Sequence, residues 1–323
     1  MSKHPPIGVV IPYYQREPGI LARALRSVAR QQNVTDVRVV VVDDGSPAPA
    51  AAEIASLRDG FPFQLEVVAQ TNGGPGLARN RALNVLAGNA RYVAFLDSDD
   101  EWSKDHLHRA LFALSRGFDA YFADHLQLGS DVSAFNRAGR LNPTDHPPIE
   151  GAEAFHVYRG DMFDQILRGN VIGTSTVVFD RQRLPEERFR AEFRNAGEDY
   201  LFWLELAAGG ARFAFSSLCE AIYGRGVNVY ARAGWGTETH FLRLHNEMRY
   251  RKMIPRLFAV SAPQEKKLTA AIRNLRHAIV RDVLHRIAHR KALPWSWARA
   301  HVLLDPQTFL LIPWLSVQVL FHK

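Results

Sequence analysis

The sequence has very little cysteine, and its apolar stretches are short. Among 323 residues Cys219 is the one cysteine, so no disulfide can form within the chain, and a reducing compartment is expected. The apolar stretch at residues 309–321 contains Pro313 and is shorter than the roughly 20 residues a membrane-spanning helix needs. The N-terminus shows no extended apolar segment followed by a cleavage site, so no signal peptide is expected. With 47% hydrophobic residues the chain is long enough to bury a core, which excludes a disordered protein.

Positive charge is concentrated in one part of the chain. The formal net charge is +7, and residues 243–299 hold 14 lysines and arginines against three acidic residues. This predicts a polyanionic partner. We expect an anionic membrane surface and no nucleic acid, because neither an aromatic-rich RNA motif nor a DNA-binding signature is present; the alternative is a solvated basic helix face. The stretch 309–321 is then either an interfacial anchor or a helix packed on the protein.

The first 125 or so residues alternate short β-branched runs with helical stretches. Strands are expected at 7–12, 37–43, 64–69 and 92–97, and helices at 20–31, 50–58 and 76–87. This rhythm is typical of a doubly wound α/β sheet with parallel strands.

The rest of the chain is less regular at first. Residues 126–150 are rich in Gly, Ser, Asn, Asp and Pro and predict a surface excursion. Afterwards we expect strands at 174–180 and 211–217, helices at 198–208 and 263–293, and a mostly helical C-terminal part. The apolar side of the last helix is formed by Leu268, Ile272, Leu275, Ile279, Val283 and Ile287.

Aspartates follow the ends of two predicted strands. Asp43 and Asp44 come after the second strand, and Asp97, Asp99 and Asp100 after the fourth. The carboxyl ends of parallel strands share one edge of a sheet, where ligands bind. Clustered carboxylates repel one another unless a cation joins them, which predicts Mg²⁺ or Mn²⁺ together with a diphosphate. Taken singly, DDGS is equally typical of a turn, and Asp100 of a cap on the helix beginning near Ser103.

The order of the motifs is more specific than any one of them. PYY, VVVVDDGS, NGGPGLARN, VAFLDSDDEW and NAGEDYLFW follow one another as in family 2 glycosyltransferases, which this sequence resembles. The resemblance implies an α/β GT-A fold. It assigns residues 1–240 to the catalytic domain, with a nucleotide-binding half at 1–125 and an acceptor half at 126–240, and leaves 241–323 as a basic helical extension.

The resemblance implies a UDP-sugar donor and its contacts. Tyr14 would flank the uracil, with Gln15 in place of the family's usual Asn, and Asp43 or Asp44 would accept the uracil N–H. Arg79 would reach the base or the diphosphate, and Asp97 the ribose. Pro12 and Ser98 complete the nucleotide-binding set, and Asp99 would hold the metal.

The second half would supply the base and the acceptor contacts. Asp199 of the ED pair would deprotonate the acceptor hydroxyl, since a sugar hydroxyl is a weak nucleophile while it keeps its proton. The acceptor candidates are Glu198, Asn170, Thr174, Trp203 and Trp235, the last within a Gly-rich loop at 223–240 expected to close over the substrates.

The QxxRW motif of processive family members is absent, so one sugar would be added at a time. The chain also resembles bacterial glucosyltransferases that build succinoglycan-type exopolysaccharide. This implies UDP-glucose as donor, a polyprenyl-diphosphate-linked oligosaccharide as acceptor, and a peripheral place on the cytoplasmic face of the inner membrane.

Other functions fit the sequence less well. A nucleotidyltransferase would carry a Gly-rich basic loop after the first strand, where this chain has PYYQREPG, and an oxidoreductase would carry GxGxxG there. A sugar-nucleotide sensor without activity would lack the metal carboxylate or the base. A transferase acting on lipopolysaccharide or on a protein glycan remains an alternative.

Overall fold

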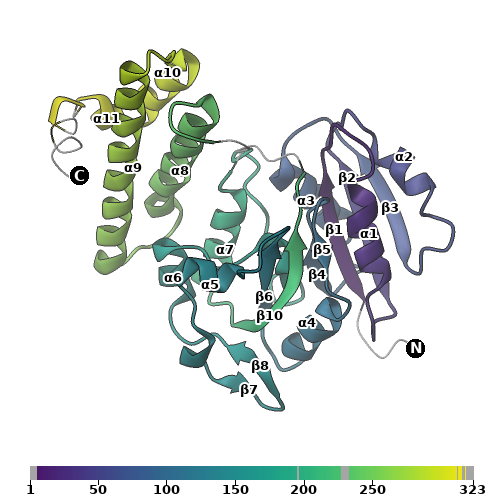
Figure 1. Ribbon diagram of the computed structural model, residues 1–323. Helices are drawn as coiled ribbons and strands as arrows, with labels where there is room; N and C mark the ends of the chain where they lie inside the picture. Colours follow the sequence, from purple (N-terminus) through teal and green to yellow (C-terminus); the bar gives the residue numbers. More distant parts are fainter. Residues whose placement is uncertain (1–5, 195, 227–232, 311, 315–316, 318–323) are drawn as a thin grey trace. The chain divides into compact units, whose positions relative to one another are not determined.

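The computed structural model describes residues 6–194, 196–226, 233–310, 312–314 and 317 (Figure 1). The chain divides into two compact units: unit 1 is Met1–Arg194 with Glu198–Val227, and unit 2 is Asn195–Gly197 with Asn228–Lys323. The domain boundary expected at residue 240 falls inside unit 2, and that division stays a prediction. Parts of the segments interpreted as a closing loop and an anchor, at 227–232, 311, 315–316 and 318–321, lie outside the described residues, as do the first five residues.

Unit 1 is built on a mixed sheet. Its strands are β1 (Ile7–Tyr13), β2 (Val37–Asp43), β3 (Gln64–Ala69), β4 (Tyr92–Phe95), β5 (Glu101–Trp102), β6 (Ala120–Gln127), β7 (Pro148–Ile149), β8 (Ala152–Val157), β9 (Val178–Asp180) and β10 (Phe213–Tyr223). They are ordered β3-β2-β1-β4-β9-β6-β10-β8-β7, and β5 pairs with β10. Strands β3, β2, β1 and β4 are parallel, whereas β9 runs antiparallel to both β4 and β6. The predicted parallel α/β half is confirmed.

Both faces of the parallel half are buried. On β1, Ile7, Val9 and Ile11 join the core cluster that also contains Leu21 and Leu25 of helix α1 (Leu21–Ala29). The residues between them on β1 are fully buried as well. Successive side chains of a strand point to opposite faces, so a continuous apolar run is what a sheet covered on both sides requires.

The other helices of unit 1 are α2 (Ala50–Ala55), α3 (Pro75–Val85), α4 (His106–Leu114), α5 (Ala134–Ala138), α6 (Met162–Arg168) and α7 (Glu198–Ala208), with 3₁₀ turns η1 (Pro143–Asp145) and η2 (Thr174–Thr176). One expectation was wrong: the strand predicted at 174–180 begins at Val178, because Thr176 donates its hydroxyl hydrogen to the Gly173 carbonyl and closes a turn. The excursion at 126–150 lies mostly at the surface, as expected, and the buried side chains of Phe135, Leu141 and Ile149 anchor it.

Unit 2 is helical in its described residues, with α8 (Glu238–Leu257), α9 (Ala262–Ala288), α10 (Trp295–Leu304) and α11 (Pro306–Leu310). Helix α9 begins where the Ser261 N–H donates to Oε1 of Gln264 at 2.9 Å. Of its predicted apolar side, Leu275 and Ile279 are buried in a core with Phe241 and Met248. Ile287 is 65% exposed, so that part of the prediction was wrong. None of the helices described here combines the length and the apolar character needed to span a membrane.

Candidate functional site

The two aspartates after β2 fix the loops beside them. Asp43 accepts the N–H of Ser46 at Oδ1 and the N–H of Ala50 at Oδ2, both at 2.8 Å, which closes the turn and starts α2. Asp44 accepts the N–H groups of Gly73 and Gly74 at 2.7 Å. The turn interpretation of DDGS therefore holds for Asp43, whereas Asp44 fixes the loop at Gly73 and Gly74. A contact of either carboxylate with a nucleobase stays a prediction.

The end of β1 separates its two tyrosines. Tyr13 is buried, and its hydroxyl donates to Oε1 of Glu53 at 2.9 Å, whereas the next residue, Tyr14, is partly exposed. Pro12 lies within the buried strand. Gln15 donates from Nε2 to the Ser98 hydroxyl at 3.1 Å and so joins the end of β1 to the DSDD segment. Tyr14 is thus the accessible aromatic ring of this strand end.

Arg79 bridges the two halves of the site. Its buried guanidinium donates from Nη2 to Oδ1 of Asp97 at 2.6 Å and from Nη1 to Oε1 of Glu198 at 3.2 Å. Glu198 is itself buried, and its carboxyl group faces Arg79 in the interior. Its contact with the acceptor stays a prediction. Contact of Arg79 with a diphosphate stays a prediction.

The carboxylates of the DSDD segment lie close together and are largely shielded from solvent. Burial raises the pKa of Asp99, and the nearby Asp97 charge adds to this. Burial, Asp97 and Asp99 together raise the pKa of Asp100 to about 8. Asp100 does not cap a helix: it accepts from the Ser175 hydroxyl at 2.5 Å and from the Gly224 N–H at 2.8 Å. Mutually repelling carboxylates of this kind are stabilised by a nearby cation.

The segment after β10 lies directly on these carboxylates. The Gly226 N–H donates to Oδ2 of Asp99 at 2.6 Å, and a Cβ on Gly224 would overlap the Asp99 carbonyl oxygen. The sequence interpretation recognised a Gly-rich loop here but missed its contact with DSDD. The paired glycines of YGRG were the available signal, because close backbone approach excludes larger residues.

Asp199 lies at the start of α7 and is partly exposed. Its Oδ1 accepts the Tyr200 N–H at 2.7 Å, and its Oδ2 accepts the Thr174 hydroxyl at 3.4 Å. Thr174 follows a segment in which Asn170 closes a local turn through both its amide atoms and Ile172. Asp199 and Thr174 are thus brought together as expected for neighbours at one site.

One acceptor candidate is buried away from this group, and another belongs to unit 2. Trp203 is 0% exposed and packs against Phe95, Phe189 and Phe202, so its predicted acceptor contact was wrong. Trp235 is an exposed residue of unit 2, and its predicted role as a sugar platform stays a prediction.

Ser175 is a positioning residue that the sequence interpretation missed. Besides its bond to Asp100, its Oγ accepts the Asp97 N–H at 3.0 Å. Its own N–H donates to the Tyr223 hydroxyl at 3.2 Å, and its carbonyl accepts the Trp102 indole N–H at 2.5 Å. One small residue therefore orders both ends of DSDD. The only signal was a run of hydroxyl residues, T-S-T, where a strand was expected.

The donor atoms fit a hard divalent cation. Within the described residues no three His, Cys, Asp or Glu side chains converge as a complete metal site. One or two carboxylates at Asp97 and Asp99, completed by phosphate oxygens, is the arrangement that Mg²⁺ prefers. The site thus holds the carboxylates of Asp97 and Asp99 at the DSDD segment and that of Asp199 at the start of α7; their roles as metal ligands and base stay predictions.

Comparison with known proteins gives consistent matches. Residues 8–173 match the family described as Glycosyl transferase family 2. The succinoglycan biosynthesis protein ExoW of Rhizobium meliloti (strain 1021) is 36% identical over 230 residues, covering 69% of this chain and 70% of ExoW.

Two solved structures share the fold. The mannosyltransferase PcManGT from Pyrobaculum calidifontis, in complex with GDP-Man and Mn²⁺, is 17% identical with a TM-score of 0.60, over 99% of this chain and 88% of that one. S. aureus TarS 1–349, in complex with UDP-GlcNAc, is 18% identical with a TM-score of 0.54, over 88% of this chain and 73% of that one.

Proposed function

The chain belongs to glycosyl transferase family 2 and is a glycosyltransferase of GT-A fold, and from this premise we propose that it transfers single glucose residues from UDP-glucose, with inversion, to a lipid-linked oligosaccharide. The observation that carries the proposal is the Arg79 bridge. It ties Asp97 of the DSDD segment to Glu198, the neighbour of the proposed base Asp199. Donor and acceptor chemistry are thereby assigned to one connected group of side chains.

The donor would bind along the strand ends. Tyr14 offers a partly exposed ring to the uracil, and Asp97 keeps part of its carboxylate accessible for the ribose. Pro12, Asp43, Asp44 and Ser98 would shape the pocket through the turns and contacts they form. A UDP donor is supported by the TarS complex with UDP-GlcNAc, a protein that shares the fold.

Asp99 would hold the divalent metal, with Asp97 nearby. When bound, Mg²⁺ or Mn²⁺ supplies Lewis-acid stabilisation to the departing diphosphate. The raised pKa of Asp99 supports this assignment, because a cation offsets the burial and the repulsion that raise it. The Mn²⁺ in the PcManGT complex is a further support.

Asp199 would act as the general base. Its Oδ1 is held by the Tyr200 N–H, so Oδ2 is the oxygen that would take the proton. The acceptor oxygen bonds to the anomeric carbon, the bond from that carbon to the diphosphate breaks, its electron pair leaves on UDP, and the hydroxyl proton passes to Asp199. Attack opposite to the leaving group inverts the anomeric centre. Thr174 would keep the carboxylate oriented.

The acceptor and the class of pathway are proposed from the similarity to ExoW. ExoW is a succinoglycan biosynthesis protein, and we propose exopolysaccharide biosynthesis for this chain as well. The acceptor would be an oligosaccharide on a polyprenyl diphosphate, reached at the cytoplasmic face of the inner membrane.

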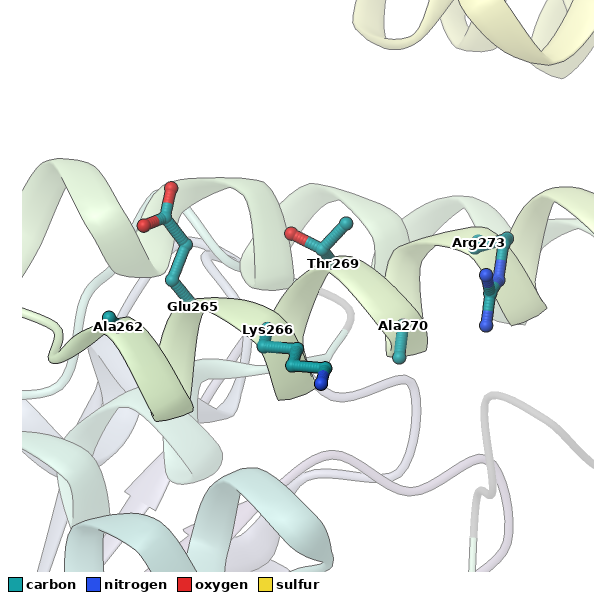
Figure 2. Close-up of a pocket in the computed structure, with 6 residues that line it drawn as sticks. All are labelled: Ala262, Glu265, Lys266, Thr269, Ala270 and Arg273. Atoms are coloured by element: carbon teal, nitrogen blue, oxygen red, sulfur yellow. The ribbon is translucent and has the colours of Figure 1, made fainter.

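Unit 2 would make a peripheral contact with that membrane. Among its described residues the exposed large apolar side chains are Trp235, Ile287, Trp295, Val302, Leu303, Leu310, Trp314 and Val317. Basic residues accompany them, and on α9 a hollow of about 420 Å³ is flanked by Lys266 and Arg273, which extend to the same side of the helix in Figure 2. Apolar residues combined with lysines and arginines suit a surface of anionic lipids.

The decisive experiment measures UDP release from UDP-glucose with Mn²⁺, using membranes that carry lipid-linked oligosaccharide as acceptor. Wild type is expected to turn over, and Asp199→Asn to lose at least about 100-fold in kcat while still binding UDP. Glu192→Gln, an exposed residue before α7, is the matched control. Acceptor-dependent turnover by Asp199→Asn at the wild-type rate would exclude Asp199 as the base.

A further inference from the structure

A cavity of about 430 Å³ lies in unit 1 beside the segment that leads to Thr174. Helix α5 forms one wall and residues 170–173 form the other, with His125 of β6 between them. Its last lining residue, Gly173, directly precedes Thr174, whose hydroxyl contacts Asp199. Adjacent Cα atoms are about 3.8 Å apart, so the cavity begins one residue before a side chain that contacts the proposed base Asp199.

Two arginines give the cavity its charge. Arg137 and Arg140 both line it and are exposed, and neither guanidinium has a hydrogen-bond or ion-pair partner in the part of the chain that the structure describes. Arg140 lies against the backbone of Gly169, where a Cβ would overlap the guanidinium. The glycine therefore makes room for this arginine beside the 170–173 wall.

His125 supplies a buried polar group without a partner. The residue is 8% exposed, and its Nδ1 is inaccessible to solvent and has no hydrogen bond among the described residues. Its ring stacks on Tyr223, with centroids 4.0 Å apart, which fixes its orientation. Asp124 accepts the N–H groups of both His125 and Phe135, so the start of α5 is held beside the imidazole.

The imidazole is neutral at physiological pH. Burial lowers the pKa of His125 to about 4, and the positive charge of Arg137 also lowers it, against an opposing effect of Asp124. His125 thus offers a hydrogen bond suited to a sugar hydroxyl, while the positive charge of the cavity comes from the two arginines.

We propose that this cavity binds an anionic group of the acceptor glycan, a carboxylate or a phosphate, through Arg137 and Arg140. A guanidinium matches both anions because its planar N–H groups donate two parallel hydrogen bonds to their oxygens. This inference rests on the proposed function, since it places the acceptor next to Asp199, and it narrows that acceptor to charged glycans.

The test is a binding titration that does not depend on turnover. Protein labelled at histidine is titrated with methyl β-glucoside 6-phosphate, methyl β-glucuronide and neutral methyl β-glucoside, following the His125 imidazole signals, which are assigned with His125→Gln. We expect at least one charged probe to bind roughly tenfold or more tightly than the neutral one. Preference for the phosphate identifies a phosphate-bearing acceptor, and preference for the glucuronide an acidic sugar.

Paired variants separate the cavity from general charge effects. Arg137→Gln/Arg140→Gln is expected to lose the preference for the anionic probes and to bind UDP as wild type does, which also shows that it is folded. Arg30→Gln/Arg58→Gln removes the same charge from exposed positions elsewhere and is expected to keep the preference.

Equal binding of neutral and charged probes, or an unchanged preference in Arg137→Gln/Arg140→Gln, would overturn the inference. So would the same loss in the control pair. Failure of the proposed function would be seen separately, as absence of UDP release from UDP-glucose by the wild-type enzyme.

Discussion

Arg79 on α3 donates a buried hydrogen bond to Glu198 at the start of α7, with 3.2 Å between Nη1 and Oε1, across 119 positions of the sequence. The same guanidinium binds Asp97, so a single cation serves two carboxylates. Aromatic packing supports it, since the ring of Phe189 lies 5.2 Å from the guanidinium carbon. The orientation of the helix that carries Asp199 is thus coupled to the DSDD segment.

Removing Arg79 alone is expected to be costly. Arg79→Leu leaves Asp97 without its counter-charge and the buried Glu198 without its hydrogen-bond donor, and should lower the free energy of unfolding by about 3 kcal/mol. In Arg79→Leu/Glu198→Leu the second buried carboxyl is gone, and part of that stability should return, but activity should not, because Asp97 still lacks its partner. Urea unfolding and UDP release measure the two effects. Equal stability of the single and double variants would show that the pair is not coupled.

Glu198 should make stability fall as the pH rises. Burial raises its pKa to about 8, and the Asp199 charge adds to this while Arg79 opposes it; the ordinary value is 4.5. Between these values the folded protein holds a proton that the unfolded chain has released. The contribution of Glu198 to the free energy of unfolding is therefore complete below about pH 4.5, its pKa in the unfolded chain. It is lost as the pH rises through about 8, its pKa in the folded protein.

As the pH rises from about 5 to about 8.5, the free energy of unfolding should therefore fall less in Glu198→Gln than in wild type. We expect the two falls to differ by on the order of a few kcal/mol. Chemical unfolding at a series of pH values gives the comparison, with the exposed Glu192→Gln as control. Parallel curves for wild type and Glu198→Gln would contradict the burial of a protonated carboxyl.

The local elements of the fold were predictable because short-range patterns specify them. Strands β2 and β3 and helix α7 have the expected boundaries, since each is a run of one periodicity ended by polar or small residues. Helix α7 is apolar on all sides, a feature typical of a buried helix. That pattern already placed Trp203 in the core, and its assignment to the acceptor disregarded it.

The long-range contacts were not predictable in this way. Nothing near Arg79 indicates Glu198, and nothing near Asp100 indicates Ser175 or Gly224, because hydrogen-bond partners far apart in sequence meet only after the sheet has formed. The strand pattern placed Asp43 at the end of β2 and Asp97 and Asp99 just after β4, where the structure has them. Which carboxylates hold the backbone and which remain accessible was decided by packing.

Gly224→Ala should disturb the DSDD segment. The added Cβ would overlap the carbonyl oxygen of Asp99, and Gly224 also donates its N–H to Asp100, so the backbone has to shift. We expect a loss of about 1–3 kcal/mol in stability together with reduced activity. Gly234→Ala is the control, because its Cβ would meet no atom within 4 Å, and it should stay within about 0.5 kcal/mol of wild type. Equal stability of the two variants would contradict the close approach.

Membrane binding by unit 2 should depend on its exposed apolar residues. Trp295 is 66% and Leu303 86% exposed, and replacing both with serine should weaken co-sedimentation with vesicles containing anionic lipid by roughly tenfold or more, because burial of each side chain contributes about 2 kcal/mol. Leu128→Ser/Val132→Ser changes exposed apolar residues of unit 1 and should bind as wild type. If wild type bound neutral and anionic vesicles equally well, the lysines and arginines of unit 2 would not contribute to membrane binding.

The metal assignment is tested by thermal stabilisation with UDP. A ligand that binds only the folded protein raises its melting temperature with concentration. If Asp99 holds the metal, UDP with Mn²⁺ should stabilise wild type more than UDP alone, and EDTA should remove the difference. Asp99→Asn should lose the Mn²⁺ increment and keep the part due to UDP, whereas the exposed Asp59→Asn should behave as wild type. An undiminished Mn²⁺ increment in Asp99→Asn would assign the metal to another carboxylate, and Asp97→Asn would then be the variant to lose it.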